Sequence, residues 1–242
     1  MLSVSLSQAI FAHRGASAHA PENTLAAFRL ALESQADGIE LDTHLSADDQ
    51  IMVIHDENVS RTTNGQGKVY NLKFEELRKL DAGNGETIPT LAEVFDLIGS
   101  KLYINIELKG FSSSAAMLPQ KVTKLVHERN LDQKIIYSSF NPLLLINTRK
   151  HSPQAKLGLL MLPGGFGTAI RLIFSPFVRP WSLNPHFSSV SPKFFQRAKQ
   201  HNRSVITYTV NQADEMRRLF ALGINGIITD DPELALEVRE TK

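Results

Sequence analysis

Two histidines follow short apolar runs, each beside a second charged residue. His13 and Arg14 follow "AIFA", and His55 and Asp56 follow "IMVI". A turn after the first run needs only Gly15, so it does not explain an imidazole next to a guanidinium. An anionic ligand is one explanation, because both groups donate charge-assisted hydrogen bonds to negative oxygen atoms.

Three carboxylates occupy alternate positions of two predicted strands. Side chains two apart share a face of a strand, which groups Glu40, Asp42 and His44 in "GIELDTHL", and Glu107 and Lys109 in "KLYINIELK". If these faces point into a barrel, the carboxylates need a compensating cation, because burying them alone is unfavourable. Oxygen ligands of this kind suit Mg²⁺ or Ca²⁺. The alternative is that both strands have one solvated face, as edge or antiparallel strands do.

The same groups together suit the cleavage of a phosphodiester. A metal ion would polarise the phosphoryl oxygens, and Arg14 and Lys109 would neutralise the developing charge. His13 and His55 would serve as general base and general acid, in an order that the sequence does not fix. A lone histidine is commonly a hydrogen-bonded structural group, so the hypothesis depends on the whole set.

Strand and helix patterns alternate along the chain, and these elements must position the site. Apolar strand patterns occur at residues 6–13, 37–46, 101–109, 134–139, 156–161, 181–184, 204–210 and 226–229. Helical patterns occur at residues 23–35, 90–100, 115–130, 142–151, 191–200, 212–222 and after Asp231. Such alternation predicts parallel strands joined by right-handed crossovers. In 242 residues it favours a single α/β domain, 1–242, folded as a (β/α)8 TIM barrel, with an open doubly wound sheet as the alternative.

Two segments interrupt the alternation. Residues 56–89, after the second barrel strand, are dense in Asn, Gly and charge, which predicts a small insertion beside the barrel. Residues 163–181 are apolar, and their glycines and prolines bracket one short predicted helix. We expect an extra helix that seals the top of the barrel. The alternatives are a lid that contacts the substrate or lipid, and the face of a homodimer.

Composition excludes several classes of function. The chain has 26 basic and 25 acidic residues and no continuous basic tract, so a nucleic-acid partner is not expected. It has no cysteine, which excludes disulfides, thiolate metal sites and cysteine nucleophiles. No apolar run is long enough for a transmembrane segment, and residues 1–12 lack the basic start of a signal peptide. We therefore expect a cytoplasmic protein that begins with a strand.

Several blocks resemble the glycerophosphodiester phosphodiesterase family, in particular its cytoplasmic bacterial type. In chain order they are "HRGASAHAPENT", "DGIELDTHLSADDQIMVIHDENVSRTTNGQGKV", "INIELK", "SSFNP", "TYTVN" and "GIITDDPE". They extend from residue 13 to residue 233, and the first two are long and specific. The resemblance implies a TIM barrel with an insertion after its second strand.

The resemblance also implies a reaction and its residues. The expected reaction is hydrolysis of glycerophosphodiesters, such as glycerophosphocholine or glycerophosphoethanolamine, to sn-glycerol 3-phosphate and an alcohol. The implied residues are metal ligands at Glu40, Asp42 and Glu107, an acid and a base at His13 and His55, and phosphate contacts at Arg14 and Lys109. Glu22 matches a position near the metal and is a further candidate ligand. Tyr208 stands where the family often has tryptophan, beside the substrate.

Two other functions remain open. A lysophospholipase D would use the same chemistry on a substrate that keeps one acyl chain, and the apolar segment 163–181 is its support. A non-catalytic barrel that binds phosphodiesters would be expected to have lost a histidine or carboxylate, and none of the matched positions has. In every case the expected partner is a small phosphodiester.

Overall fold

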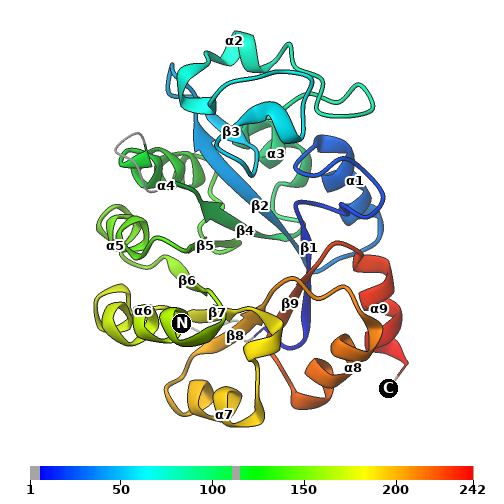
Figure 1. Ribbon diagram of the computed structural model, residues 1–242, viewed down its shortest axis with the longest axis vertical. Coiled ribbons are helices and arrows are strands. Elements are labelled where there is room, and N and C mark those ends of the chain that lie inside the picture. Colours follow the sequence, from blue (N-terminus) through cyan, green and yellow to red (C-terminus); the bar gives the residue numbers. More distant parts are fainter. Residues whose placement is uncertain (1–5, 111–114, 242) are drawn as a thin grey trace.

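A closed barrel forms the centre of the molecule. The computed structural model describes residues 6–110 and 115–241. Nine strands form one sheet in the order β1-β9-β8-β7-β6-β5-β4-β2-β3, and pairing of β1 with β2 closes it (Figure 1). Every pair in the ring is parallel, and only β3 runs antiparallel, against β2. The predicted (β/α)8 barrel is confirmed, and the open sheet is excluded.

Apart from β3, which the alternation did not predict, the strands occupy the predicted positions. They are β1 Ala9–His13, β2 Gly38–Leu45, β3 Ile51–Val53, β4 Tyr103–Leu108, β5 Ile135–Ser139, β6 Lys156–Met161, β7 Ser182–Pro185, β8 Ser204–Thr207 and β9 Gly226–Thr229. Residues 1–5 of the apolar N-terminus, predicted to lead into the first strand, lie outside the described residues. The apolar run before His55 forms the short strand β3, which pairs antiparallel with β2. His55 therefore follows this added strand and not a strand of the barrel.

Helices cover the outside of the barrel. They are α1 Leu25–Glu33, α2 Phe74–Leu77, α3 Leu91–Ile98, α4 Leu118–Glu128, α5 Pro142–His151, α6 Gly164–Val178, α7 Pro192–Gln200, α8 Ala213–Leu222 and α9 Pro232–Glu240. Local chemistry fixes several starts. Thr90 and Glu93 form a capping box at α3, and Asp231 caps α9 ahead of Pro232.

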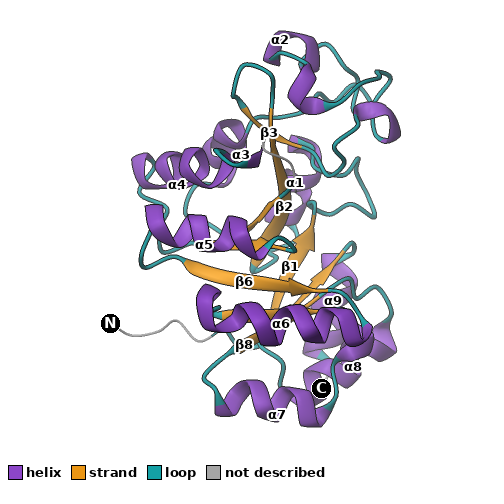
Figure 2. Cartoon of the chain, turned by 60° about the vertical axis from the view of Figure 1, so that its left-hand side comes forward, coloured by secondary structure: helices purple, strands orange, loops and turns teal. Residues whose placement is uncertain are grey.

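The apolar segment 163–181 differs from expectation. Its helix, α6, is 15 residues long and takes the ordinary place between β6 and β7, beside α5 (Figure 2). The prediction of an extra sealing helix is therefore wrong. Glycine lowers helix propensity, but Gly167 packs where a Cβ atom would lie 1.9 Å from the Leu162 carbonyl oxygen, so packing selects glycine inside the helix. None of the described helices is long and apolar enough to cross a membrane.

The insertion has a small core of its own. Residues 56–89 contain α2 and two short 3₁₀ turns, and they lie beside the barrel next to β3 (Figure 1). Their buried apolar side chains cluster with the end of β3, and this cluster comprises Met52, Ile54, Val59, Val69, Leu77, Ala82 and Ile88. The predicted insertion after the second barrel strand is confirmed.

Candidate active site

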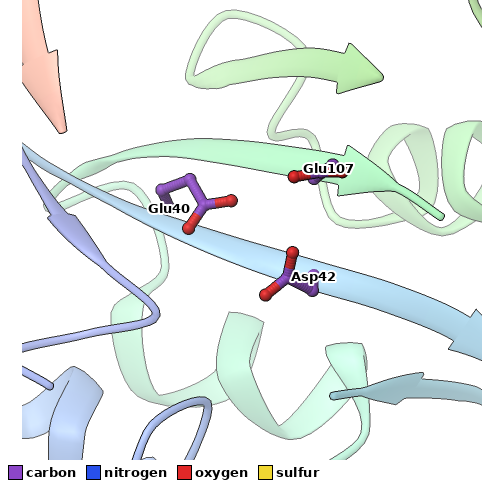
Figure 3. Close-up of side chains that lie close together, drawn as sticks. All are labelled: Glu40, Asp42 and Glu107. Atoms are coloured by element: carbon purple, nitrogen blue, oxygen red, sulfur yellow. The ribbon is translucent and has the colours of Figure 1, made fainter. Parts of the chain in front are cut away.

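Three carboxylates meet at neighbouring strands of the barrel. In the register of β2 and β4, Glu40 pairs with Asn105, and Asp42 pairs with Glu107. Ligand oxygens of Glu40, Asp42 and Glu107 all lie within 4.8 Å of one another, and Figure 3 shows the carboxylates turned together. The exposed fractions of the three residues are 3%, 1% and 7%. The predicted grouping is therefore present, and the face that carries it is buried and not solvated.

Two cationic side chains, Lys109 and Arg14, contact the carboxylate cluster. Lys109 Nζ lies 2.8 Å from Glu107 Oε1 and 3.1 Å from Asp42 Oδ1, and Arg14 Nε lies 3.3 Å from Asp42 Oδ2. Burial would raise the pKa of Asp42, but Lys109 and Arg14 outweigh burial and lower it. Burial, with repulsion from the other two carboxylates, raises the pKa of Glu40 well above its usual value. Burial also raises the pKa of Glu107, to about 7. If all three carboxylates were ionised they would outnumber the two cations, and the raised pKa values of Glu40 and Glu107 reflect this imbalance.

The chemistry of the donors fits a hard divalent cation. The cluster offers oxygen ligands only, as Mg²⁺ and Ca²⁺ prefer. Asn105, the register partner of Glu40, has both amide atoms buried without a hydrogen-bond partner in the described chain. Buried amides are normally satisfied, so this position can accept a water or ligand atom. The three carboxylates are a possible metal site.

His13 ends β1 and is held by an acidic residue that follows β9. Its Nδ1 lies 2.5 Å from Asp230 Oδ1, and the two positions are 217 residues apart. Asp230 also accepts hydrogen bonds from Ser17 and Asn211. Burial raises the pKa of Asp230, but the hydrogen bond from His13 and the others lower it overall. The carboxylate therefore stays charged and fixes the imidazole through one nitrogen.

His55 is held in the same way by its neighbour in sequence. His55 Nδ1 lies 2.5 Å from Asp56 Oδ1, and Arg61 Nε lies 2.5 Å from Asp56 Oδ2. The hydrogen bond from Arg61 is the main cause that lowers the pKa of Asp56, to about 2. Burial lowers the pKa of His55. Within the described chain, the Nε2 atoms of both His13 and His55 are left without a hydrogen-bond partner and are free for proton transfer.

A tight turn connects β1 to the carboxylate cluster. Arg14 and Gly15 both have left-handed backbone, with φ of 55° and 84°, and a Cβ on Gly15 would lie 2.6 Å from the Ala27 backbone. This turn places Arg14 Nη1 2.7 Å from Glu22 Oε1. Glu22 also binds Arg61, at 2.8 and 2.9 Å. Glu22 thus lies outside the metal cluster, and its role as a ligand stays a prediction.

A cavity of about 1020 Å³ adjoins these groups. His55, Glu107 and Lys109 line its polar part, and its apolar part includes Phe140, Leu160, Met161 and Leu162. Tyr208 supports this apolar wall, because its hydroxyl donates to the Met161 carbonyl at 2.8 Å and its ring packs edge-on against Phe140. Direct contact of Tyr208 with a substrate stays a prediction.

Sequence reasoning assigned no role in the site to four residues. Asp230, Asp56 and Arg61 orient the histidines, and Asn23 Nδ2 donates to Asp42 Oδ2 at 2.9 Å. A signal was present in two cases. Asp56 directly follows His55, and Asp230 stands next to the helix cap Asp231, where a single aspartate would have sufficed.

Comparison with known proteins identifies a matching family and related enzymes. The glycerophosphoryl diester phosphodiesterase family matches residues 13–234. A glycerophosphodiester phosphodiesterase of Caldanaerobacter subterraneus is 40% identical, over 95% of this chain and 96% of that protein. A human lysophospholipase D is 29% identical, over 91% of this chain and 82% of that protein.

The fold has solved counterparts as well. The structure of an Oleispira antarctica phosphodiesterase in complex with the product sn-glycerol-3-phosphate has a TM-score of 0.88 and 27% identity, and 98% of each chain is covered. The fold and enzyme class predicted from the sequence are confirmed. The chain belongs to the glycerophosphoryl diester phosphodiesterase family.

Proposed function

We propose that this chain hydrolyses glycerophosphodiesters, such as glycerophosphocholine and glycerophosphoethanolamine, to sn-glycerol 3-phosphate and an alcohol. One observation carries the proposal. Two histidines, each oriented at Nδ1 by a carboxylate, share one end of the barrel with a buried three-carboxylate cluster. Hydrolysis of a phosphodiester needs a proton acceptor, a proton donor and charge stabilisation, and this end of the barrel supplies all three.

Glu40, Asp42 and Glu107 would hold Mg²⁺ or Ca²⁺. When bound, the ion would polarise a phosphoryl oxygen and help to position the glycerol end of the substrate. Arg14 and Lys109, which already contact the cluster, stabilise the negative charge that grows on the phosphoryl oxygens. Their positive charges also assist capture of the anionic substrate.

The two histidines move the protons. One removes a proton from the attacking oxygen as a new bond to phosphorus forms. This oxygen belongs to water, or to a glycerol hydroxyl that forms a cyclic phosphate, which water then hydrolyses to sn-glycerol 3-phosphate. The other donates a proton to the leaving alcohol as its bond to phosphorus breaks. Asp56 and Asp230 keep each Nδ1 engaged, which leaves Nε2 as the proton-transfer atom of both rings.

A lysophospholipase D is the second candidate. The cavity beside His55 and Lys109 has a wall built from Phe140, Leu160 and Met161, which could accommodate an acyl chain. The similarity to a human lysophospholipase D favours the same alternative. Both activities use one set of catalytic groups, so they differ only in what occupies this cavity.

Two assays test the proposal. One measures release of glycerol 3-phosphate from glycerophosphocholine and glycerophosphoethanolamine, and the other measures release of the phosphate product from a lysophospholipid. Each assay is run with EDTA and then with Mg²⁺ or Ca²⁺ restored. We expect metal-restored activity on the small diesters, and we expect His13→Ala and His55→Ala each to lower kcat by roughly 10²–10⁴. His127→Ala, on the exposed side of α4, is the matched control. Calorimetry checks that each variant still binds the metal.

The other outcomes separate the alternatives. Activity on the lysophospholipid alone would select the lysophospholipase D. No activity on any substrate, with the metal still bound, would favour a non-catalytic binding barrel. The single domain, the cytoplasmic location and a homodimer remain parts of the proposal.

A further inference from the structure

Charge is distributed very unevenly along the chain. Residues 133–213 contain ten Lys and Arg residues and no Asp or Glu, although the whole chain carries a formal charge of only +1. The basic residues are interspersed, so no continuous tract marks the region. The stretch from β5 to β8, with α5, α6 and α7, forms one side of the barrel (Figure 1). This side of the molecule is therefore strongly basic.

A groove between α6 and α7 concentrates this charge. It has a volume of about 580 Å³, and its cationic lining comprises Arg171, Lys193, Arg197 and Arg203. Both ribbon views place α6 and α7 side by side (Figure 2). The described residues that line the groove include no carboxylate. Lys193 and Arg197 make no hydrogen bond or ion pair through their side chains in the described chain, and Arg171 Nε is buried without a partner.

Helix dipoles do not account for these cations. A basic residue in the last turn of a helix is favourable, and Arg197 is in the last turn of α7. Lys193, however, lies in the first turn of α7, where a cation is unfavourable, and Arg171 lies in the middle of α6. Burial and the charge of Arg197 both lower the pKa of Arg171. The groove therefore fits an anionic partner that the chain itself does not supply.

Exposed apolar side chains lie next to the groove. Leu172, Ile173 and Phe177 of α6 are 62%, 59% and 67% exposed. Leu172 also lines the groove, as does Pro176, so cations and apolar groups share one surface. This combination is typical of elements that lie in the interface of an anionic bilayer, where apolar side chains enter the headgroup region and basic ones bind phosphates.

We propose that the α6–α7 face, defined by the groove and the exposed apolar residues of α6, docks on the surface of an anionic phospholipid bilayer. A second copy of the chain fits less well, because a two-fold contact would set the same cations against each other. A nucleic acid would neutralise the cations but leave the apolar side chains without a partner. This docking goes beyond the proposed hydrolysis and does not depend on it.

Docking on this face would also bear on the catalytic end of the barrel. Gly167, in the second turn of α6, lines the large cavity that contains His55 and Lys109. The helix that contacts the bilayer is thus the helix that borders the proposed substrate cavity.

Sedimentation with sucrose-loaded vesicles tests the proposal on the full chain. Vesicles of phosphatidylcholine alone are compared with vesicles that also contain phosphatidylglycerol. We expect binding that requires phosphatidylglycerol and weakens as salt is added. Arg171→Gln/Arg197→Gln should lower the partition coefficient roughly thirtyfold, because each cation near an anionic surface contributes to binding. Ile173→Ser/Phe177→Ser should lower it about tenfold or more.

The matched control is Arg29→Gln/Lys79→Gln. Both residues are exposed cations without an ion pair in the described chain, and they lie at α1 and after α2, away from the groove. We expect this control to change binding less than about threefold, although the net charge falls equally. Thermal midpoints report whether each variant is folded. If Arg171→Gln/Arg197→Gln does not fold, Lys193→Gln, at an exposed position, replaces it as the groove variant.

Four results would overturn the proposal. The first is that the chain does not bind phosphatidylglycerol vesicles at low salt, and the second is that the control variant loses as much vesicle binding as the groove variant. The third is that Arg171→Gln/Arg197→Gln abolishes binding to single-stranded RNA but leaves vesicle binding intact. The fourth is that Ile173→Ser/Phe177→Ser converts a dimer to a monomer without changing vesicle binding. The third would assign the groove to nucleic acid. The fourth would assign the apolar residues to self-association.

Discussion

At the scale of single residues, Glu40 gives the clearest indication of a cation site. It lies with Asp42 and Glu107 in a buried cluster, and Lys109 and Arg14 are the only cationic side chains among the described residues that contact this cluster. Its pKa is raised well above the usual value by burial and by both neighbouring carboxylates. The protein therefore gains little from a charge on Glu40 until a divalent ion is present, because the ion would bind the charged form.

Substitution of Glu40 should separate stability from metal binding. We expect Glu40→Gln to leave the thermal midpoint in EDTA unchanged or higher, since the amide removes like-charge repulsion without opening a cavity. The rise in midpoint caused by Mg²⁺ or Ca²⁺ should shrink, because that rise measures binding to the folded state. Differential scanning fluorimetry measures both. Glu33→Gln, exposed on α1, is the control, and a full metal response in the Glu40 variant would contradict the assignment.

The pH profile can assign the role of His55. Burial lowers the pKa of His55, and the hydrogen bond to Asp56 opposes this effect. Asp56→Asn should therefore lower that pKa further. A base acts unprotonated, so a base at His55 moves the acidic limb of kcat/KM to lower pH. An acid acts protonated, so an acid at His55 moves the alkaline limb to lower pH. Asp214→Asn, exposed on α8, is the control, and two unmoved limbs would remove His55 from proton transfer.

Residue-scale prediction worked where one strand fixes the geometry. Alternation was sufficient to group Glu40 with Asp42 on β2 and Glu107 with Lys109 on the next predicted strand, because side chains two apart must share a face. It could not find Asp230, since the contact with His13 spans 217 residues and forms only when β9 pairs with β1. Spacing in the sequence carries no information about such a contact.

At the scale of elements, the turn after β1 determines where the guanidinium of Arg14 lies. Gly15→Ala should destabilise the fold by more than the ~1–2 kcal/mol of a left-handed alanine, because its Cβ would also meet the Ala27 backbone. Gly85→Ala is the matched control, since Gly85 also has a positive φ but no atom within 4 Å of the added Cβ. Urea unfolding measures both, and equal losses would show that contact with Ala27 does not matter.

Element boundaries were predictable except where packing outweighs propensity. α5 begins at Pro142 and ends at His151, as the pattern predicts. α6 includes Gly164, Gly165 and Pro176, which read in the sequence as boundaries. The difference has a physical cause. A helix must cover the outer face of the barrel between β6 and β7, and its tertiary contacts outweigh the loss of helix propensity, which is about 1 kcal/mol per glycine.

At the scale of the whole molecule, one strand links the insertion to the barrel. Met52 of β3 packs in the insertion core, whereas Ile51 and Val53 of the same strand pack in the barrel core. We expect the single domain, 1–242, to unfold in one transition, with urea curves from Trp181 fluorescence and far-ultraviolet circular dichroism superimposed. Ile88→Ala, in the insertion core, should shift both curves together. A shift confined to circular dichroism would mean that the insertion unfolds alone.

Closure of the barrel has a consequence for the chain during its synthesis. β1 pairs with both β2 and β9, and the carboxylate that orients His13 directly follows β9. A nascent chain already carries the carboxylate cluster and His55 long before Asp230 leaves the ribosome. His13 is oriented only when β9 and Asp230 have been made, so the proposed activity requires a chain that extends at least to Asp230.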